Sequence, residues 1–175
     1  MQKSLTNMLV IIEKALMIIL LIFISTSCGV QENEKYENNV GFIDPKDALG
    51  DKEFKTCGNY IYEYYNSFPH GGFKYGKKAL RDLVMRKYKT ENTESGYLTF
   101  RFVVNCQGVA GRYEIIENDL NHAPAKLDKN IVSKLFQLTR DLREWKQITL
   151  DNQPRDYYLY ITYKLSDGKI IEILP

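Results

Sequence analysis

The segment Tyr97–Asn105 restricts the possible folds more than any other part of the chain, because apolar and mostly polar residues alternate along it. The apolar positions of this alternation are Leu98, Phe100, Phe102 and Val104. A period of two residues predicts a β-strand with one face in a core. A second alternating segment, Val109–Glu117, follows after the short turn Asn105-Cys106-Gln107-Gly108. Two strands joined by so short a turn predict an antiparallel hairpin.

Two helices and a second hairpin complete the predicted domain. Apolar residues repeat every three or four positions over Lys77–Lys87 and, more strongly, over Asp128–Glu144. Asp156–Leu165 alternates again, and the tight-turn sequence Ser166-Asp167-Gly168-Lys169 joins it to a short terminal strand, Ile170–Leu174. This order predicts an α+β fold, in which a small antiparallel sheet carries two helices packed on one face.

The N-terminal segment has the order of features found in secretory signals. Lys3 supplies positive charge, Ala15–Ile24 is an unbroken apolar run, and the small residues Ser25-Thr26-Ser27 directly precede Cys28. We therefore expect residues 1–27 to be a signal peptide that is removed from the folded protein.

A membrane-spanning helix is the alternative interpretation of this segment. The apolar run is about half the roughly 20 residues that a spanning helix needs. Extending the run back to Met8–Ile12 would bury Glu13 and Lys14, at a cost of about 2.5–3.5 kcal/mol each near the centre of a bilayer. The secretory interpretation is therefore favoured.

A cysteine at the cleavage point is a feature of lipoprotein signals, and residues 25–28 resemble a lipobox. The resemblance implies that the thiol of Cys28 receives a diacylglycerol and that its amino group is acylated after cleavage. Several acyl chains together hold a protein stably in a membrane. Gly29, which follows the cysteine, would permit sorting to the outer membrane, unlike an aspartate at that position. We expect a lipid-anchored protein of the cell envelope, on either the periplasmic or the surface face.

The rest of the chain divides into a tether and one domain. Residues 28–55 comprise a polar tether and an irregular lead-in, and residues 56–175 form the domain. Within it, Tyr60–Tyr65 suits either a strand or a helix. The formal net charge of +2 does not indicate a nucleic-acid partner. The 13 tyrosines suit a half-exposed sheet or an interface.

Two cysteines remain when Cys28 carries lipid. In an oxidising compartment Cys57 and Cys106 are candidates for a disulfide, which would contribute about 3–4 kcal/mol in the chain-entropy model. Two unpaired thiols that never meet are an equally open alternative, because sequence does not show proximity.

Catalytic and metal-binding patterns are weak in this sequence. Cys57, Cys106, His70 and His122 have the right ligand types for zinc, but no two of them have the close spacing of a ligand pair. A Cys–His nucleophilic dyad needs a reduced thiol in a basic setting, and Cys106 is expected in a hairpin turn. No phosphate loop, serine elbow or carboxylate pair is present in the sequence. We expect a protein that is not an enzyme and needs no cofactor or metal.

Several short segments together resemble the C-terminal domain of the TonB family, through their order and spacing rather than through one motif. An aromatic-Pro-Gly-Gly segment leads into a helix that ends in Lys-Tyr, a Phe-Val-Val strand precedes a polar turn, and Leu-Asp-Lys and Trp-Lys flank the second helix. The matching residues are Phe68–Gly72, Ala79-Leu80, Lys87-Tyr88, Gly96, Phe102–Val109, Leu127–Lys129, Trp145-Lys146 and Arg155–Leu165.

The resemblance implies a binding module that pairs an extended segment of an envelope or outer-membrane protein with a sheet edge. With a lipid anchor and a short tether in place of a spanning helix and a long linker, energy transduction is not expected. The candidate edge residues are Tyr157, Leu159, Ile161, Tyr163, Ile171 and Ile173. A covered edge without a partner is the alternative. The rival functions are a structural envelope lipoprotein that self-associates and, least favoured, an enzyme.

Overall fold

The structure, a computed structural model, describes residues 42–63 and 72–174. Predictions about the signal peptide, Cys28, the tether and His70 lie outside the described residues. The described elements, in chain order, are β1 (Ile61–Tyr62), α2 (Gly76–Lys87), β2 (Gly96–Val104), β3 (Ala110–Asn118), α3 (Lys129–Arg140), β4 (Ile148–Leu150), β5 (Gln153–Ser166) and β6 (Lys169–Leu174).

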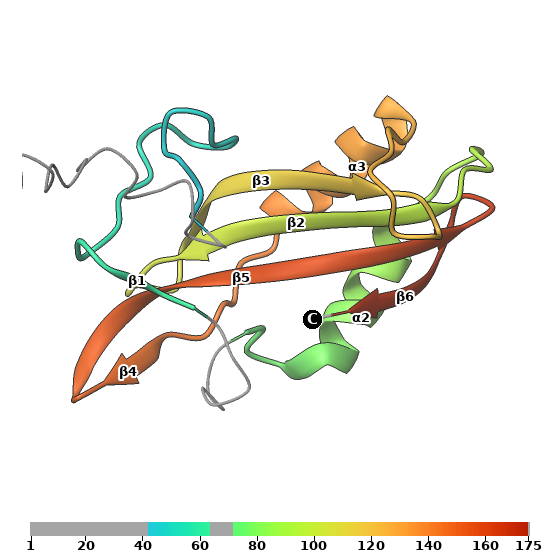
Figure 1. The fold of residues 1–175 in the computed structure, drawn as a ribbon. Helices are drawn as coiled ribbons and strands as arrows, with labels where there is room; N and C mark the ends of the chain where they lie inside the picture. Colours follow the sequence, from blue (N-terminus) through green and yellow to red (C-terminus); the bar gives the residue numbers. More distant parts are fainter. Residues whose placement is uncertain (1–41, 64–71, 175) are drawn as a thin grey trace, which may run out of the picture. The chain divides into compact units, whose positions relative to one another are not determined.

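The strands form one mixed sheet with β5 at its centre (Figure 1). The main path runs β1-β5-β2-β3, and β4 and β6 also pair with β5. Every pairing is antiparallel except that of β1, which lies parallel to β5. The α+β class is confirmed, but the prediction of a purely antiparallel sheet is wrong at β1. A strand of two residues is too short for a sequence pattern to predict how it pairs.

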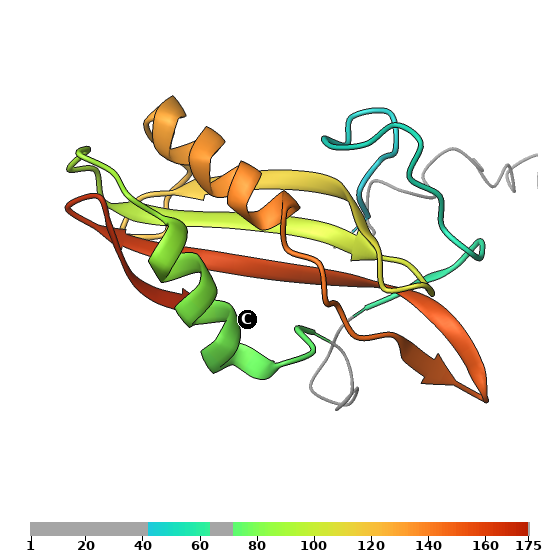
Figure 2. The same ribbon diagram turned by 180° about the vertical axis from the view of Figure 1, so that it is seen from behind.

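Both helices lie on the same side of the sheet, as expected (Figure 2). The inward residues of β2 alternate as the sequence predicts and are fully buried against Leu80 and Val84 of α2 and Ile131 and Leu135 of α3. β5 contributes Tyr157, Leu159, Ile161, Tyr163 and Leu165 to this same core.

The opposite face of the sheet is partly covered by the predicted lead-in. Ile43 packs with Val103 and Tyr158, and Phe54 packs against this cluster. Gly111 of β3 leaves room for the Phe54 ring, because a Cβ at this position would collide with the ring. A bridge between Leu49 and Tyr113 attaches the lead-in to β3.

Helix α3 ends earlier than the prediction. Its first turn is capped by the Asp128 carboxylate, which accepts hydrogen bonds from the amides of Asn130 and Ile131. The apolar spacing continues to Trp145, but the helix ends at Arg140. The backbone of residues 144–146 instead pairs with residues 72–74, through the Phe73–Trp145 bridge and hydrogen bonds on either side of it. Trp145 is therefore buried, but not on a helix.

Candidate functional site

The disulfide between Cys57 and Cys106 is present, which resolves the alternative left open by the sequence. The S–S distance is 2.09 Å and the two Cα atoms lie 6.0 Å apart. Cys57 precedes β1, whereas Cys106 lies in the turn between β2 and β3, so the bond joins the segment before β1 to the β2–β3 hairpin.

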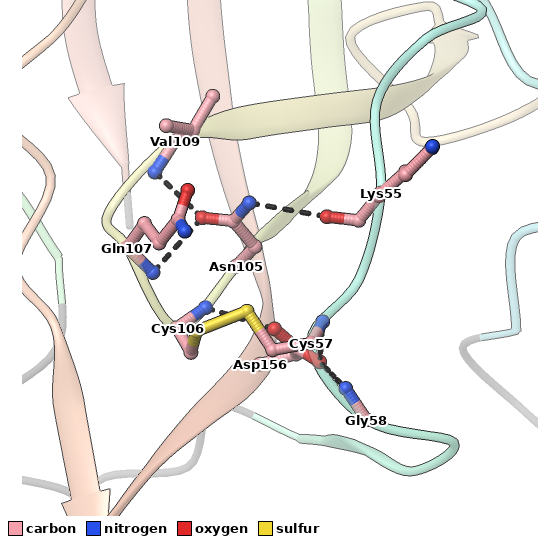
Figure 3. Close-up of a disulfide and its surroundings, with 8 residues drawn as sticks. All are labelled: Lys55, Cys57, Gly58, Asn105, Cys106, Gln107, Val109 and Asp156. Atoms are coloured by element: carbon pink, nitrogen blue, oxygen red, sulfur yellow. Dashed lines mark hydrogen bonds between the residues drawn. A yellow bond between two sulfur atoms is a disulfide. The ribbon is translucent and has the colours of Figure 1, made fainter.

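Asp156 of β5 lies beneath this bond and contacts both ends of it (Figure 3). Its Oδ2 accepts hydrogen bonds from the amides of Cys57 (2.8 Å) and Gly58 (2.9 Å), and its Oδ1 accepts one from the amide of Cys106 (2.8 Å). Asp156 is only 2% exposed. Three backbone donors compensate for the burial of the carboxylate.

Asn105 organises the same turn from its other side. Its Oδ1 accepts from the amides of Gln107 and Val109, each at 3.0 Å, and its Nδ2 donates to the Lys55 carbonyl at 3.1 Å. The hydrogen bond from Asn105 to Lys55 therefore joins the turn to the lead-in beside the disulfide (Figure 3).

The structure does not assemble the zinc site or the Cys–His dyad considered from sequence. Both sulfurs are in the disulfide, and His122 stacks on Tyr97 at the opposite end of β2, with ring centroids 4.5 Å apart. Asp156 lies within 4.8 Å of both sulfurs, but its oxygens already accept three amide hydrogens and disulfide sulfurs are not thiolate ligands.

The candidate edge residues of β5 differ in what lies beside them. Tyr157 pairs with Tyr62 on one side and Val104 on the other, and Tyr163 pairs with Ile173 and Leu98. These two positions do not lie at an edge.

The short stretch Tyr158–Ile161, which includes Leu159 and Ile161, has a paired strand only on its β2 side among the described residues. It lies between the positions paired with β1 and those paired with β6.

β6 is an edge strand in the described part of the chain, since its only pairing there is with β5. Ile171 falls at the register shift of this pairing and is 47% exposed, whereas Ile173 is half-buried against the core. The edge prediction therefore applies to β6 and to the Tyr158–Ile161 stretch of β5, which lies beyond the end of β6.

A hollow of about 140 Å³ adjoins this edge. Its apolar walls are Phe73, Leu80, Trp145, Leu159, Ile161, Ile173 and Leu174, with Tyr160 beside them. Lys77 and Lys146 are its charged lining residues. The Tyr157 hydroxyl holds two lining residues of the hollow together: it donates a hydrogen bond to the Lys146 carbonyl at 2.8 Å and accepts one from the Gly72 amide at 3.2 Å.

A second, more polar cleft of about 600 Å³ lies between the lead-in, the β2–β3 turn and the end of α3. Tyr113, Arg140 and Arg143 line it, with Asp51 and Glu53 among the facing residues. Burial raises the pKa of Tyr113 to about 12, although the two arginines lower it. Because charges of both signs line the cleft, it does not define one class of ligand.

Two features of the site were missed from sequence. Asp156 was placed only as the first residue of a strand, and Phe73 was not assigned a role opposite Trp145. Neither residue has a local pattern that signals these contacts, which join positions 50 or more residues apart.

Comparison of the chain with protein-family models, with curated proteins and with solved structures found no match.

Proposed function

We propose that this chain is an envelope lipoprotein, anchored through Cys28, whose domain binds a partner protein by strand addition. The apolar run followed by Ser25-Thr26-Ser27-Cys28 supports export and lipidation. The Cys57–Cys106 disulfide agrees with an oxidising compartment. The proposal requires no catalytic residue, metal or cofactor.

The outer side of β6 and of Tyr158–Ile161 in β5, which pairs with no further strand among the described residues, is the observation that carries the binding proposal. An edge strand presents unpaired amide and carbonyl groups, to which an extended peptide can add as a further strand. Side-chain pockets next to such an edge provide specificity. The hollow beside Leu159 and Ile161 can receive an apolar side chain of the added segment.

Charge at the same place favours an acidic or neutral partner segment. Lys77 and Lys146 line the hollow, and the exposed Lys74 and Lys78 lie close by in sequence, each already paired with a carboxylate. Electrostatic complementarity of this kind contributes more to partner choice and association rate than to affinity.

Ile171→Lys tests this proposal, with Leu120→Lys as its matched control. The two residues are exposed to nearly the same extent, 47% and 48%, but only Ile171 lies on the proposed edge. A lysine on an edge strand opposes the addition of another strand. A photo-reactive residue at position 171 should give a discrete crosslinked partner in cells. When that partner is co-purified with the detergent-solubilised protein, Ile171→Lys should reduce its recovery about tenfold, whereas Leu120→Lys should leave it unchanged.

Two outcomes would contradict strand addition at this edge. Equal recovery with both lysine variants would place partner binding elsewhere on the domain. Crosslinks from position 171 only to a second copy of the same chain would favour the rival, a structural lipoprotein that self-associates.

A further inference from the structure

Asp156 connects three parts of the chain that are remote in sequence. It belongs to β5, pairs with Ile61 of β1, and accepts amide hydrogens from both cysteines of the disulfide. The cysteines are 49 residues apart, and Asp156 follows Cys106 by another 50. The disulfide loop therefore does not contain the residue that contacts both of its ends.

We infer that Asp156 is a positioning residue for disulfide formation, which brings Cys57 and Cys106 together before the bond exists. All three of its donors are backbone amides, which are present whether the cysteines are reduced or oxidised. A buried carboxylate without donors is strongly unfavourable, so the fold that satisfies Asp156 also places the two cysteine backbones side by side. An oxygen of Asp156 and the two sulfurs lie within 4.8 Å of one another.

This arrangement makes oxidation dependent on the docking of β5. Until β5 lies beside β2, no carboxylate holds the two cysteine segments, and the thiols meet only by loop closure. Oxidation then fixes a sheet that has already formed, rather than trapping an incomplete one. The inference does not depend on the strand-addition proposal.

The chemistry is ordinary thiol–disulfide exchange with a disulfide oxidant, such as oxidised glutathione. One cysteine thiolate attacks the oxidant and forms a mixed disulfide, which releases one glutathione thiolate. The second cysteine thiolate attacks the protein sulfur of that mixed disulfide, which closes Cys57–Cys106 and releases the second glutathione. Two electrons pass from the cysteine pair to the oxidant, and the two thiol protons pass through solvent to the released thiolates. Asp156 acts on the second step, because it sets how often the two sulfurs meet.

Asp156→Asn tests the inference, because the amide keeps the shape but can no longer accept at both oxygens. Full-length protein carrying Cys28→Ser is reduced in detergent and equilibrated with reduced and oxidised glutathione. The effective concentration of the two thiols should fall roughly tenfold or more, as expected for the loss of a hydrogen bond to a charged group. Singly glutathionylated protein should accumulate during oxidation. Asp47→Asn, an exposed aspartate in the lead-in, should behave like the unsubstituted protein.

An unchanged effective concentration in a folded Asp156→Asn protein would overturn the inference. A second experiment does not require that variant to fold. In Cys57→Ser/Cys106→Ser, which keeps Asp156, the amides at positions 57, 58 and 106 should remain protected from hydrogen exchange. Rapid exchange at these amides, with the rest of the sheet still protected, would mean that the disulfide holds Asp156 in place and not the reverse.

Discussion

Asp156 and Tyr163 are buried polar side chains whose hydrogen-bond partners are distant in sequence. Asp156 receives three amides, and the Thr139 hydroxyl lies 2.9 Å from that of Tyr163, which is fully buried. Burial raises the pKa of Tyr163 despite this hydrogen bond. The sequence marked Cys57 and Cys106 as a possible pair through their number and compartment, but it gave no sign of Asp156, because only the folded sheet brings that carboxylate to them.

Tyr113 provides a test at high pH. Its pKa is raised by burial from 10.0 to about 12, so between these values the unfolded chain loses the proton while the folded protein keeps it. The free energy of unfolding should therefore fall as pH rises, by up to about 1.4 kcal/mol per pH unit from this residue. Urea unfolding of Tyr113→Phe between about pH 9 and 12 should show a shallower decline than the unsubstituted protein.

The matched control for this measurement is Tyr75→Phe, which removes an exposed hydroxyl and should leave the decline unchanged. A decline in Tyr113→Phe as steep as in the unsubstituted protein would contradict the assignment of the alkaline sensitivity to Tyr113.

At the scale of elements, the long periodic segments were predictable and the short ones were not. Helix α2 begins one residue before its prediction, and β2 and β3 each lie within one residue of theirs. β4 has only three residues and was missed, whereas β1 falls in a segment that suited either strand or helix. The end of α3 was predicted too late, because Leu142 and Trp145 continue the apolar spacing of the helix. Both are buried, but the backbone has left the helix there and pairs with residues 72–74.

The β5–β6 turn supports the proposed edge and depends on Gly168. Asp167 and Gly168 both have positive φ, 48° and 73°, as the two central residues of a type I′ hairpin turn require. Two residues between α2 and β2 hold the turn through hydrogen bonds. The Gly168 amide donates to the Glu94 carbonyl, and the Tyr88 hydroxyl donates to the Gly168 carbonyl. A Cβ on Gly168 would collide with the backbone carbonyl of Asn92.

Gly168→Ala should therefore lower the free energy of unfolding by roughly 2–5 kcal/mol, from backbone strain together with the collision. Gly76→Ala separates the two causes, because Gly76 has a similar φ of 82° with nothing within 4 Å of its added Cβ. That control should lose only about 1–2 kcal/mol. Urea denaturation measures both, and equal losses would mean that the contact with Asn92 does not constrain the turn.

At the scale of the whole molecule, the proposal combines a lipid anchor with a domain in which β6 is an edge strand within the described residues. Neither of the two described helices is long and apolar enough to cross a membrane. Attachment through Cys28 would keep the domain at a membrane, where its edge can meet a protein of the same envelope. The disulfide and Asp156 hold β1 against β5, and so close one end of the edge that the partner would use.

Mass spectrometry of the protein extracted from membranes tests the central claim most directly. We expect an N-terminal peptide that begins at Cys28 and carries a thioether-linked diacylglycerol and an amide-linked acyl chain. A protein that retains residues 1–27, or that begins at another residue with a free amino group and an unmodified Cys28, would contradict the account.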